Sequence, residues 1–147
     1  MLAELGWDCR APLRIEWRDT AAYVTLRNMA PTVLVVDDDQ DIRESLAQIL
    51  TEEGFDVTSA SNGAEALAEI ARRKPDVMLL DLMMPVLTGW EVLERLRVNG
   101  TYAELPIVVL SAMKAEGCTD YLQKPIRLSK LLALIDTVRA RAARAAG

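Results

Sequence analysis

The chain has 147 residues, of which 51% are hydrophobic and 27% are charged, and its formal net charge is −5 at pH 7. This length and apolar content suit one globular domain with a substantial core and argue against a disordered chain. The acidic balance argues against broad nucleic-acid binding, and the absence of histidine excludes histidine-based triads and metal sites.

The two cysteines, Cys9 and Cys118, fit neither a metal-binding spacing nor a disulfide framework. Free thiols in a reducing compartment are the simplest interpretation, so we expect a cytoplasmic protein. No apolar stretch reaches the length of a membrane span, and the N-terminus lacks the basic-then-apolar pattern of a signal peptide. The sequence therefore predicts no membrane association.

Residues 1–28 differ in pattern from everything that follows. They show no clear period, although the segments 14–18 and 23–27 alternate enough to form short strands. Two interpretations remain open: a mis-assigned start or loose extension, and an arm that packs on the domain or on a partner. We expect the domain to span residues 29–140, with a short basic, alanine-rich tail at 141–147.

From residue 32 onward, apolar runs alternate with segments of helical spacing. Gly54 stops the first helical segment, Ser61 or Asn62 can cap the second, and Thr88 with Glu91 fits a capping box for the third. This alternation predicts an α/β fold, a doubly wound parallel sheet covered by helices on both faces. We expect strands at 32–36, 55–59, 76–80, 106–110 and 121–122. We expect one helix through residues 42–50, a second that ends near Arg73, a third that ends near Arg97, and a last one through residues 128–138.

Acids, a hydroxyl and a lysine follow the ends of these predicted strands. Asp37 and Asp38 follow the first strand, Asp81 the third, Ser111 the fourth and Lys124 the fifth. Because the carboxyl ends of parallel strands share one edge of the sheet, these groups should meet there. Two or three carboxylates can bind a hard divalent cation, and a carboxylate beside such a cation can attack a phosphoryl group.

Four segments, VLVVDDD, LLDLMMP, VVLSA and YLQKP, occur in this order and each follows a predicted strand. Together they resemble the receiver domain of two-component response regulators over about residues 32–140. Each segment supplies a different chemical group, which makes the set far more specific than any one of them. The resemblance implies a flavodoxin-like fold with five parallel strands, and a signalling domain that accepts a phosphoryl group rather than an enzyme.

One element of that fold has little room in this chain. Ten residues separate Leu110 from Tyr121, whereas a parallel crossover usually needs a dozen or more. Seven extended residues, 112–118, reach roughly 23 Å, and returning along a five-residue strand takes about 17 Å. The connection can close as a loop or a single turn, so we expect the helix that the family places there, its fourth, to be truncated or absent.

The resemblance also assigns roles to residues of the predicted site. Asp81 matches the phosphoryl acceptor, and Asp37 and Asp38 match the acid pair that holds Mg²⁺ together with it. The backbone carbonyl of Met83 would be a further metal ligand. Lys124 matches the lysine that contacts a phosphoryl oxygen.

Ser111 and Tyr121 match the two residues through which the family senses phosphorylation. Ser111 would reach the phosphoryl group, and Tyr121 would turn inward with it, although plain packing at the sheet edge remains open for Tyr121. The resemblance further implies a cis bond between Lys124 and Pro125. Asp39, by contrast, is expected to cap the following helix rather than to bind metal.

Met83 and Met113 lie two residues past Asp81 and Ser111, at positions where the family tunes the attack of water on the acyl phosphate. Neither side chain carries an acid or amide that could orient this water. We therefore expect slow self-dephosphorylation. The alternative is that both methionines merely cover the site.

The expected function is a receiver that takes a phosphoryl group from a sensor histidine kinase or phosphotransfer protein and then switches a downstream protein partner. No helix-turn-helix or enzyme domain follows the last helix, so we expect a stand-alone receiver without direct nucleic-acid contact. The alternative is a degenerate receiver that binds a partner constitutively. The truncation would uncover sheet surface that residues 1–28, a partner, a homodimer or a swapped dimer could cover. A haloacid-dehalogenase-like phosphatase is disfavoured, because Met83 stands where its second acid would be.

Overall fold

The computed structural model describes residues 30–113 and 120–146 of the chain. Residues from Pro31 onward form a compact unit of their own. The strands expected at 14–18 and 23–27 lie outside the described residues. Within the described residues, no helix is both long enough and apolar enough to cross a membrane.

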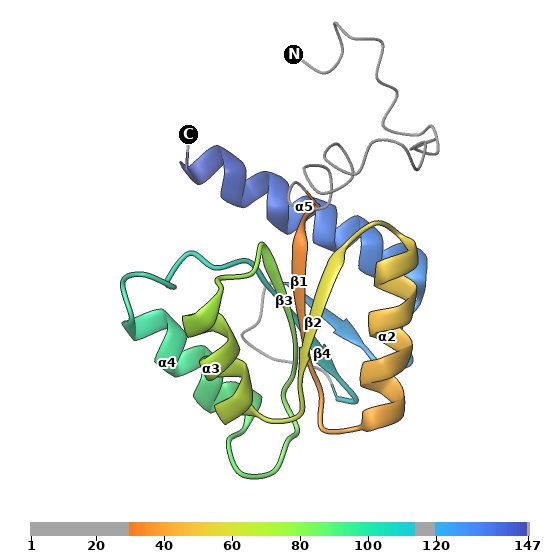
Figure 1. The fold of residues 1–147 in the computed structure, drawn as a ribbon, viewed down its shortest axis with the longest axis horizontal. Coiled ribbons are helices and arrows are strands. Elements are labelled where there is room, and N and C mark those ends of the chain that lie inside the picture. Colours follow the sequence, from red (N-terminus) through yellow and green to blue (C-terminus); the bar gives the residue numbers. More distant parts are fainter. Residues whose placement is uncertain (1–29, 114–119, 147) are drawn as a thin grey trace, which may run out of the picture. The chain divides into compact units, whose positions relative to one another are not determined.

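A five-stranded parallel sheet forms the centre of the domain (Figure 1). The strands lie in the order β2-β1-β3-β4-β5, and each pairs in parallel with its neighbours. The predicted doubly wound, flavodoxin-like α/β fold is therefore confirmed. The strands are β1 (Thr32–Val36), β2 (Asp56–Ala60), β3 (Val77–Asp81), β4 (Ile107–Ser111) and β5 (Tyr121–Gln123).

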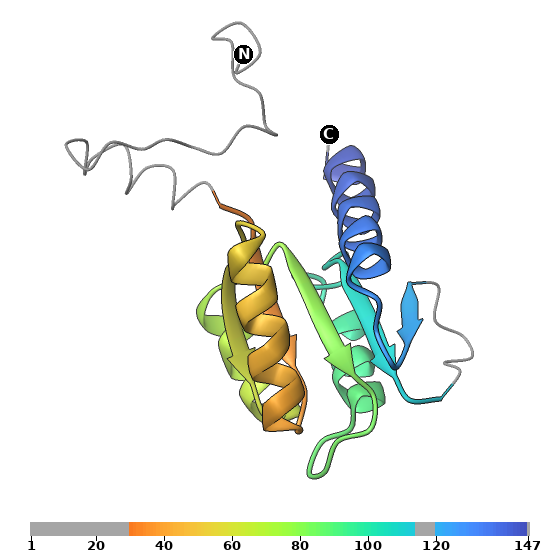
Figure 2. The same ribbon diagram turned by 90° about the vertical axis from the view of Figure 1, so that its right-hand side faces the viewer.

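Helices cover both faces of the sheet (Figures 1 and 2). They are α2 (Gln40–Glu52), α3 (Gly63–Arg72), α4 (Gly89–Val98) and α5 (Leu128–Ala146). The strands and the first three helices begin and end within about two residues of the positions expected from the sequence. The last helix is longer than its apolar pattern indicated, because it continues through residues 141–146. Alanine and arginine, which make up this segment, are both strong helix formers.

The sheet separates two apolar cores. Side chains alternate along each strand, so Leu34 and Met78 face α3 and α4, whereas Val33 and Leu79 face α2 and α5. All five residues of β3 and of β4 are buried, as expected for strands covered on both faces. The continuous apolar runs in the sequence therefore correspond to strands in the centre of the sheet.

Three helices of the described chain begin with a side-chain cap, and all three caps were expected from specific residues. Asp39 caps α2 by accepting hydrogen bonds from the backbone of Asp41 and Ile42, and Asn62 caps α3. Thr88 caps α4 in a complete capping box with Glu91. Such caps each stabilise a helix by about 1 kcal/mol. They fix where the helices start, immediately after the loops at the carboxyl edge of the sheet.

Residues 112–120 alone connect β4 to β5, since β4 ends at Ser111 and β5 begins at Tyr121. The two strands nevertheless pair in parallel, with Val109 opposite Tyr121. A connection this short does close the crossover. The described residues of the connection, 112–113 and 120, are not helical. The expectation of a truncated or absent helix falls mainly on residues 114–119, outside the described residues.

Candidate functional site

Three carboxylates converge at the carboxyl edge of the sheet. Asp37 directly follows β1 and Asp81 ends β3, and these two strands are neighbours with Val36 opposite Leu80. One oxygen each from Asp37, Asp38 and Asp81 lies within 4.8 Å of the other two. Asp37 is fully buried and Asp81 is 4% exposed, whereas Asp38 is exposed. The acids predicted from the sequence are therefore brought together.

The loop after β1 lets two consecutive acids reach the same place. The backbone N–H of Asp37 donates to the carbonyl of Ala60 at 3.2 Å, which ties the loop to the end of β2. The backbone N–H of Asp39 donates to Asp37 Oδ1 at 2.9 Å. Arg43 Nη1 donates to the backbone carbonyl of Asp37 at 2.7 Å. Asp39 itself is used as the helix cap, as predicted, and is not among the three converging acids.

Lys124 places its amine among these acids. Its Nζ lies 2.9 Å from Asp37 Oδ2 and 3.7 Å from Asp81 Oδ2. The backbone N–H of Lys124 donates to the carbonyl of Ser111 at 2.7 Å, and the bond to Pro125 is cis, as expected. Burial alone would lower the pKa of Lys124, but the hydrogen bond to Asp37 and the charges of the three acids outweigh it and raise that pKa. The amine is therefore held as a cation.

Asp81 is the acid whose ionisation is most disfavoured. Its pKa is raised from the usual 3.8 to about 6, chiefly by burial and also by the charges of Asp37 and Asp38. The backbone N–H of Met83, which donates to Asp81 Oδ1 at 3.2 Å, and the charge of Lys124 both oppose this rise. Without further positive charge, ionised Asp81 is thus poorly compensated.

The donor set of this pocket fits a hard divalent cation such as Mg²⁺, which prefers oxygen ligands. Carboxylates about 5 Å apart repel each other by roughly 3 kcal/mol per pair at an effective dielectric near 20, and Lys124 supplies only one positive charge against three negative ones. A cation held by Asp37, Asp38 and Asp81 would remove this repulsion. The backbone of Met83 lies beside Asp81, while its side chain is 64% exposed; its carbonyl as a ligand remains a prediction.

Ser111 and Tyr121 lie at opposite ends of the neighbouring strands β4 and β5. Ser111 ends β4 and is 3% exposed, and its Oγ accepts a hydrogen bond from the backbone N–H of Met113 at 3.1 Å. Tyr121 begins β5, is half-buried and packs against the core beneath α3 and α4. In this structure Ser111 therefore lies at the carboxyl edge, and Tyr121 lies toward the other end of its strand.

The loop between β3 and α4 packs tightly against the end of β3. A side chain at Gly89 would collide with the backbone carbonyl of Asp81 and would come within 2.6 Å of Leu82 Cα. Only glycine allows α4 to begin this close to Asp81. Val86, in the same loop, is 87% exposed and has a φ of 69°, in the left-handed region that β-branched residues rarely adopt.

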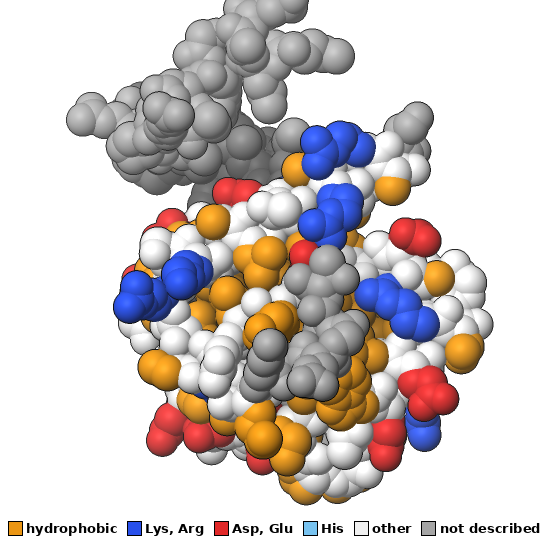
Figure 3. Space-filling model, turned by 180° about the vertical axis from the view of Figure 1, so that it is seen from behind, with side chains coloured by type: hydrophobic (Ala, Val, Ile, Leu, Met, Phe, Trp, Pro, Cys, Tyr) orange, Lys and Arg blue, Asp and Glu red, His pale blue; other side chains and the backbone are white. Residues whose placement is uncertain are grey.

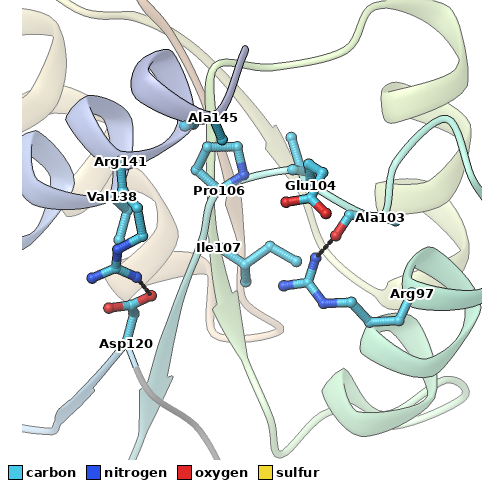
Figure 4. Close-up of a pocket in the computed structure, with 11 residues that line it drawn as sticks. Arg97, Ala103, Glu104, Pro106, Ile107, Asp120, Val138, Arg141 and Ala145 are labelled. Carbon is cyan, nitrogen blue, oxygen red and sulfur yellow. Dashed lines mark hydrogen bonds and ion pairs between the residues drawn. The ribbon is translucent and has the colours of Figure 1, made fainter. Parts of the chain in front are cut away.

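Hollows lie at both ends of the strands of the sheet. A mainly apolar groove of about 350 Å³ adjoins Lys124 and is lined by Asp41, Ile42, Ser45, Leu46, Pro125 and Ile126. The other hollow, of about 200 Å³, lies at the opposite ends of the strands, beneath the last turns of α5 (Figure 4). There Arg141 pairs with Asp120 at 2.8 Å, and Arg97 donates to the carbonyl of Ala103.

Sequence reasoning missed Arg43, whose guanidinium holds the backbone of the acid loop. Its place in the first turn of the helix after Asp37 was the only available signal. The pattern of strands and acids gave no indication that this side chain would turn back to a main-chain carbonyl.

A flavodoxin-like sheet with an acid pocket and a lysine at its carboxyl edge defines the class of fold and site. The family profile of the response regulator receiver domain matches residues 33–136. The chain therefore belongs to the response regulator receiver domain family, whose members are signalling modules of two-component systems.

Curated relatives include response regulators MprA of two mycobacteria. The protein of Mycobacterium leprae is 45% identical over 112 residues, which cover 70% of this chain and 48% of that protein. The protein of Mycobacterium tuberculosis strain H37Rv is 46% identical over 114 residues, which cover 71% of this chain and 49% of that protein. The chain thus spans about half the length of these relatives.

Solved structures of receiver proteins match the same part of the chain. The chemotaxis protein CheY4 of Vibrio cholerae superposes with a TM-score of 0.69 at 32% identity, covering 74% of this chain and 98% of that one. The receiver domain of the Francisella response regulator 1452 gives a TM-score of 0.68 at 34% identity, covering 76% and 98%. The resemblance noted in the sequence is confirmed in both fold and family.

Proposed function

We propose that Asp81 accepts a phosphoryl group from a phosphohistidine of a sensor histidine kinase or phosphotransfer protein. Because the chain contains no histidine, the donor histidine must lie outside these 147 residues. An oxygen of Asp81 attacks phosphorus and forms the new O–P bond. The P–N bond breaks, and its electron pair stays on the imidazole nitrogen, which takes up a proton. The observation that carries this proposal is the nearly buried Asp81 carboxylate beside Lys124 and two further acids.

The residues around Asp81 have separate tasks in the proposed step. Asp37, Asp38 and Asp81 would hold Mg²⁺, which when bound neutralises charge on the transferred group. Lys124 offers an ammonium group 3.7 Å from Asp81 Oδ2, so it can contact an oxygen of a phosphoryl group on that carboxylate. The loop restrained by Gly89 keeps the acceptor strand in place. Positioning and electrostatics account for most of the catalysis in phosphoryl transfer.

The phosphodonor would approach beside Lys124. The apolar groove formed by Ile42, Leu46, Pro125 and Ile126 lies next to this amine and can receive an apolar surface of the donor protein. Such a groove supports the proposal because a donor histidine must come within bonding distance of Asp81. Docking against the groove would bring it to the same edge of the sheet.

Phosphorylation would then shift a two-state equilibrium of the domain. Ser111 would bond the phosphoryl group, and Tyr121 would turn inward, changing the surface offered to a downstream protein. Apolar side chains are gathered on the face seen in Figure 3. Large exposed apolar residues of the described chain include Met83, Val86, Trp90, Val98 and Met113. An interaction with a protein partner, or with a second copy of the chain, would cover such surface.

Slow self-dephosphorylation belongs to the same proposal. Met83 and Met113, two residues past Asp81 and Ser111, are 64% and 68% exposed, and neither side chain can orient a water molecule. The phosphorylated state should therefore persist until a partner removes the group. Replacing Met83 by asparagine should speed hydrolysis on the order of tenfold, measured as loss of phosphoprotein by intact mass. A rate unchanged in Met83→Asn would mean that the methionines merely cover the site.

The second candidate is a degenerate receiver that binds a partner or dimerises without phosphorylation. The short connection of residues 112–120 favours this degenerate receiver, because the family's usual output surface begins with the helix that the family places there. The intact acids and Lys124 favour the phosphoryl-accepting function instead.

Chemical trapping tests the proposed acceptor. The full chain is treated with Mg²⁺ and phosphoramidate, a donor with a P–N bond, and the acyl phosphate is then reduced with borohydride. Reduction converts a phosphorylated aspartate to homoserine, which peptide mass mapping locates. We expect homoserine at position 81 alone. Modification spread over several acids, or no modification, would contradict the proposal.

A further inference from the structure

Arg43 is a cation that serves the acid pocket through the main chain. It lies in the first turn of α2 and is half-buried, and its Nη1 donates to the backbone carbonyl of Asp37 at 2.7 Å. Its charge also lowers the pKa of Glu65, after two larger effects from hydrogen bonds donated by Ser61. The side chain of Arg43 therefore binds the loop after β1 and carries a charge near the first turn of α3.

The loop after β1 must bring the side chains of two consecutive acids to the same place. In an extended chain, consecutive side chains point to opposite sides. Asp37 is buried and Asp38 is exposed, yet each offers an oxygen to the same cluster with Asp81. The backbone must therefore turn immediately after β1 and stay turned.

Three hydrogen bonds hold this turn. The N–H of Asp37 donates to Ala60, the N–H of Asp39 donates to the Asp37 carboxylate, and Arg43 binds the Asp37 carbonyl. The first two are made by main-chain groups or by an acid of the site. Of the three, only the contact from Arg43 can be removed by substitution without altering an acid.

We propose that Arg43 is a positioning residue for Mg²⁺: by fixing the carbonyl of Asp37, it holds the carboxylates of Asp37 and Asp38 toward one cation. This inference rests on the proposed function. The direction in which the Mg²⁺ affinity changes when Arg43 is replaced distinguishes a positioning role from an effect of its charge. Removal of a nearby positive charge should by itself strengthen Mg²⁺ binding, whereas loss of a positioning contact around metal ligands typically weakens it about 10- to 100-fold.

Calorimetric titration of the full chain with Mg²⁺ tests the proposal. Arg43→Met, which keeps the apolar stem and removes the donor, should weaken Mg²⁺ binding about tenfold or more. Arg43→Lys, which keeps a donor and the charge, should recover part of that affinity. Arg95→Met is the matched control, because Arg95 is exposed on α4, and it should bind like the parent. Equal or tighter binding by Arg43→Met would overturn the inference.

A second measurement reads the turn itself without metal. In EDTA, the amide hydrogens of Asp38 and Asp39 should exchange several times faster in Arg43→Met than in the parent, while amides in the middle of α2 should keep the parent rate. Unchanged exchange at both acids would also overturn the inference. If Arg43→Met does not fold, Arg43→Gln replaces it: the side chain is too short to reach the carbonyl, so weaker binding is expected despite the lost charge.

The two proposals fail in different ways. If the parent does not bind Mg²⁺, the proposed function fails and the inference fails with it. If the parent binds Mg²⁺ and Arg43→Met binds it equally well, only the role of Arg43 is wrong.

Discussion

Lys124 Nζ lies 2.9 Å from Asp37 Oδ2, closer than the 3.7 Å that separates it from Asp81 Oδ2. The pair joins residues 87 positions apart in the chain, the end of β1 and the loop after β5. Asp37 is fully buried, and the Lys124 side chain is only 20% exposed. The amine is therefore the counter-charge of the acid pocket in the metal-free domain, as well as the group that we propose contacts a phosphoryl oxygen.

Replacing Lys124 by methionine should destabilise the metal-free domain. It would leave a buried carboxylate beside two others without a cation, and breaking such a partly buried pair costs about 2 kcal/mol or more. Mg²⁺ should bind more tightly to this variant and restore most of the lost stability, since the cation takes over the counter-charge. Denaturant unfolding in EDTA and in Mg²⁺ measures both effects.

The control for Lys124→Met is Lys130→Met, which removes an exposed lysine from α5. It should change the free energy of unfolding by no more than about 0.5 kcal/mol. Equal stability of the two variants in EDTA would show that the pair between Lys124 and Asp37 carries no structural role.

The raised pKa of Asp81 predicts a pH-dependent cost of its ionisation in the absence of metal. A carboxyl group whose folded-state pKa lies above its unfolded value favours the folded state at low pH. That contribution is lost as the pH rises from about 4 through about 6. The rise from 3.8 to about 6 corresponds to about 3 kcal/mol. In EDTA, Asp81→Asn should therefore be more stable than the parent above pH 7.

This gain should shrink as the pH falls and should vanish below about pH 3, where Asp81 is protonated in both states. Saturating Mg²⁺ should also reduce it, because the cation stabilises the ionised parent. Thermal unfolding across this pH range in EDTA is the measurement. A gain that is constant with pH would assign the effect to packing rather than to the charge of Asp81.

Asp38 and Asp39 are neighbours with different roles, and substitution should separate them. Asp39→Ala should cost about 1 kcal/mol because it removes the cap of α2, with little change in Mg²⁺ affinity. Asp38→Ala should leave stability nearly unchanged in EDTA but weaken Mg²⁺ binding at least tenfold. Unfolding and calorimetric titration of both variants form the test. The reverse pattern would mean that the metal is held by Asp39.

Val86 adopts a φ of 69° although it is β-branched and 87% exposed. Holding such a residue in the left-handed region costs on the order of 1 kcal/mol or more. Val86→Gly should therefore stabilise the domain by about 1 kcal/mol, net of the greater freedom of glycine in the unfolded chain. Val86→Ala, which relieves only the branching, should gain less. If the glycine variant is no more stable than the alanine variant, the loop is not strained.

The sequence predicted the strands well because of how they are buried. The runs 33–36, 77–80 and 107–110 are apolar throughout, since helices cover both faces of the sheet. The roles of neighbouring acids were also separable, because Asp39 directly precedes a helix whereas Asp37 directly follows a buried strand. Because the carboxyl ends of parallel strands share one edge of the sheet, the acids and Lys124 could be predicted to lie in one site.

Features that depend on the folded arrangement of the chain could not be predicted from the sequence in the same way. Nothing in the sequence marks the carbonyl that the long side chain of Arg43 would reach. A valine at position 86 argues against the left-handed conformation that it adopts. The last turns of α5 were predictable in principle from their alanine and arginine content, but their ion pair from Arg141 to Asp120 required the fold.

The central claim is that Asp81 accepts a phosphoryl group in a Mg²⁺-dependent reaction. The most direct measurement is the intact mass of the full chain after incubation with acetyl phosphate, beside Asp81→Ala, in Mg²⁺ and in EDTA, with size-exclusion elution recorded in parallel. The account predicts one added phosphoryl group on the parent in Mg²⁺ and none in the other three samples. A changed elution volume on phosphorylation would mean that the output is assembly. An unmodified parent, or equal modification of Asp81→Ala, would contradict the account and favour a receiver that binds constitutively.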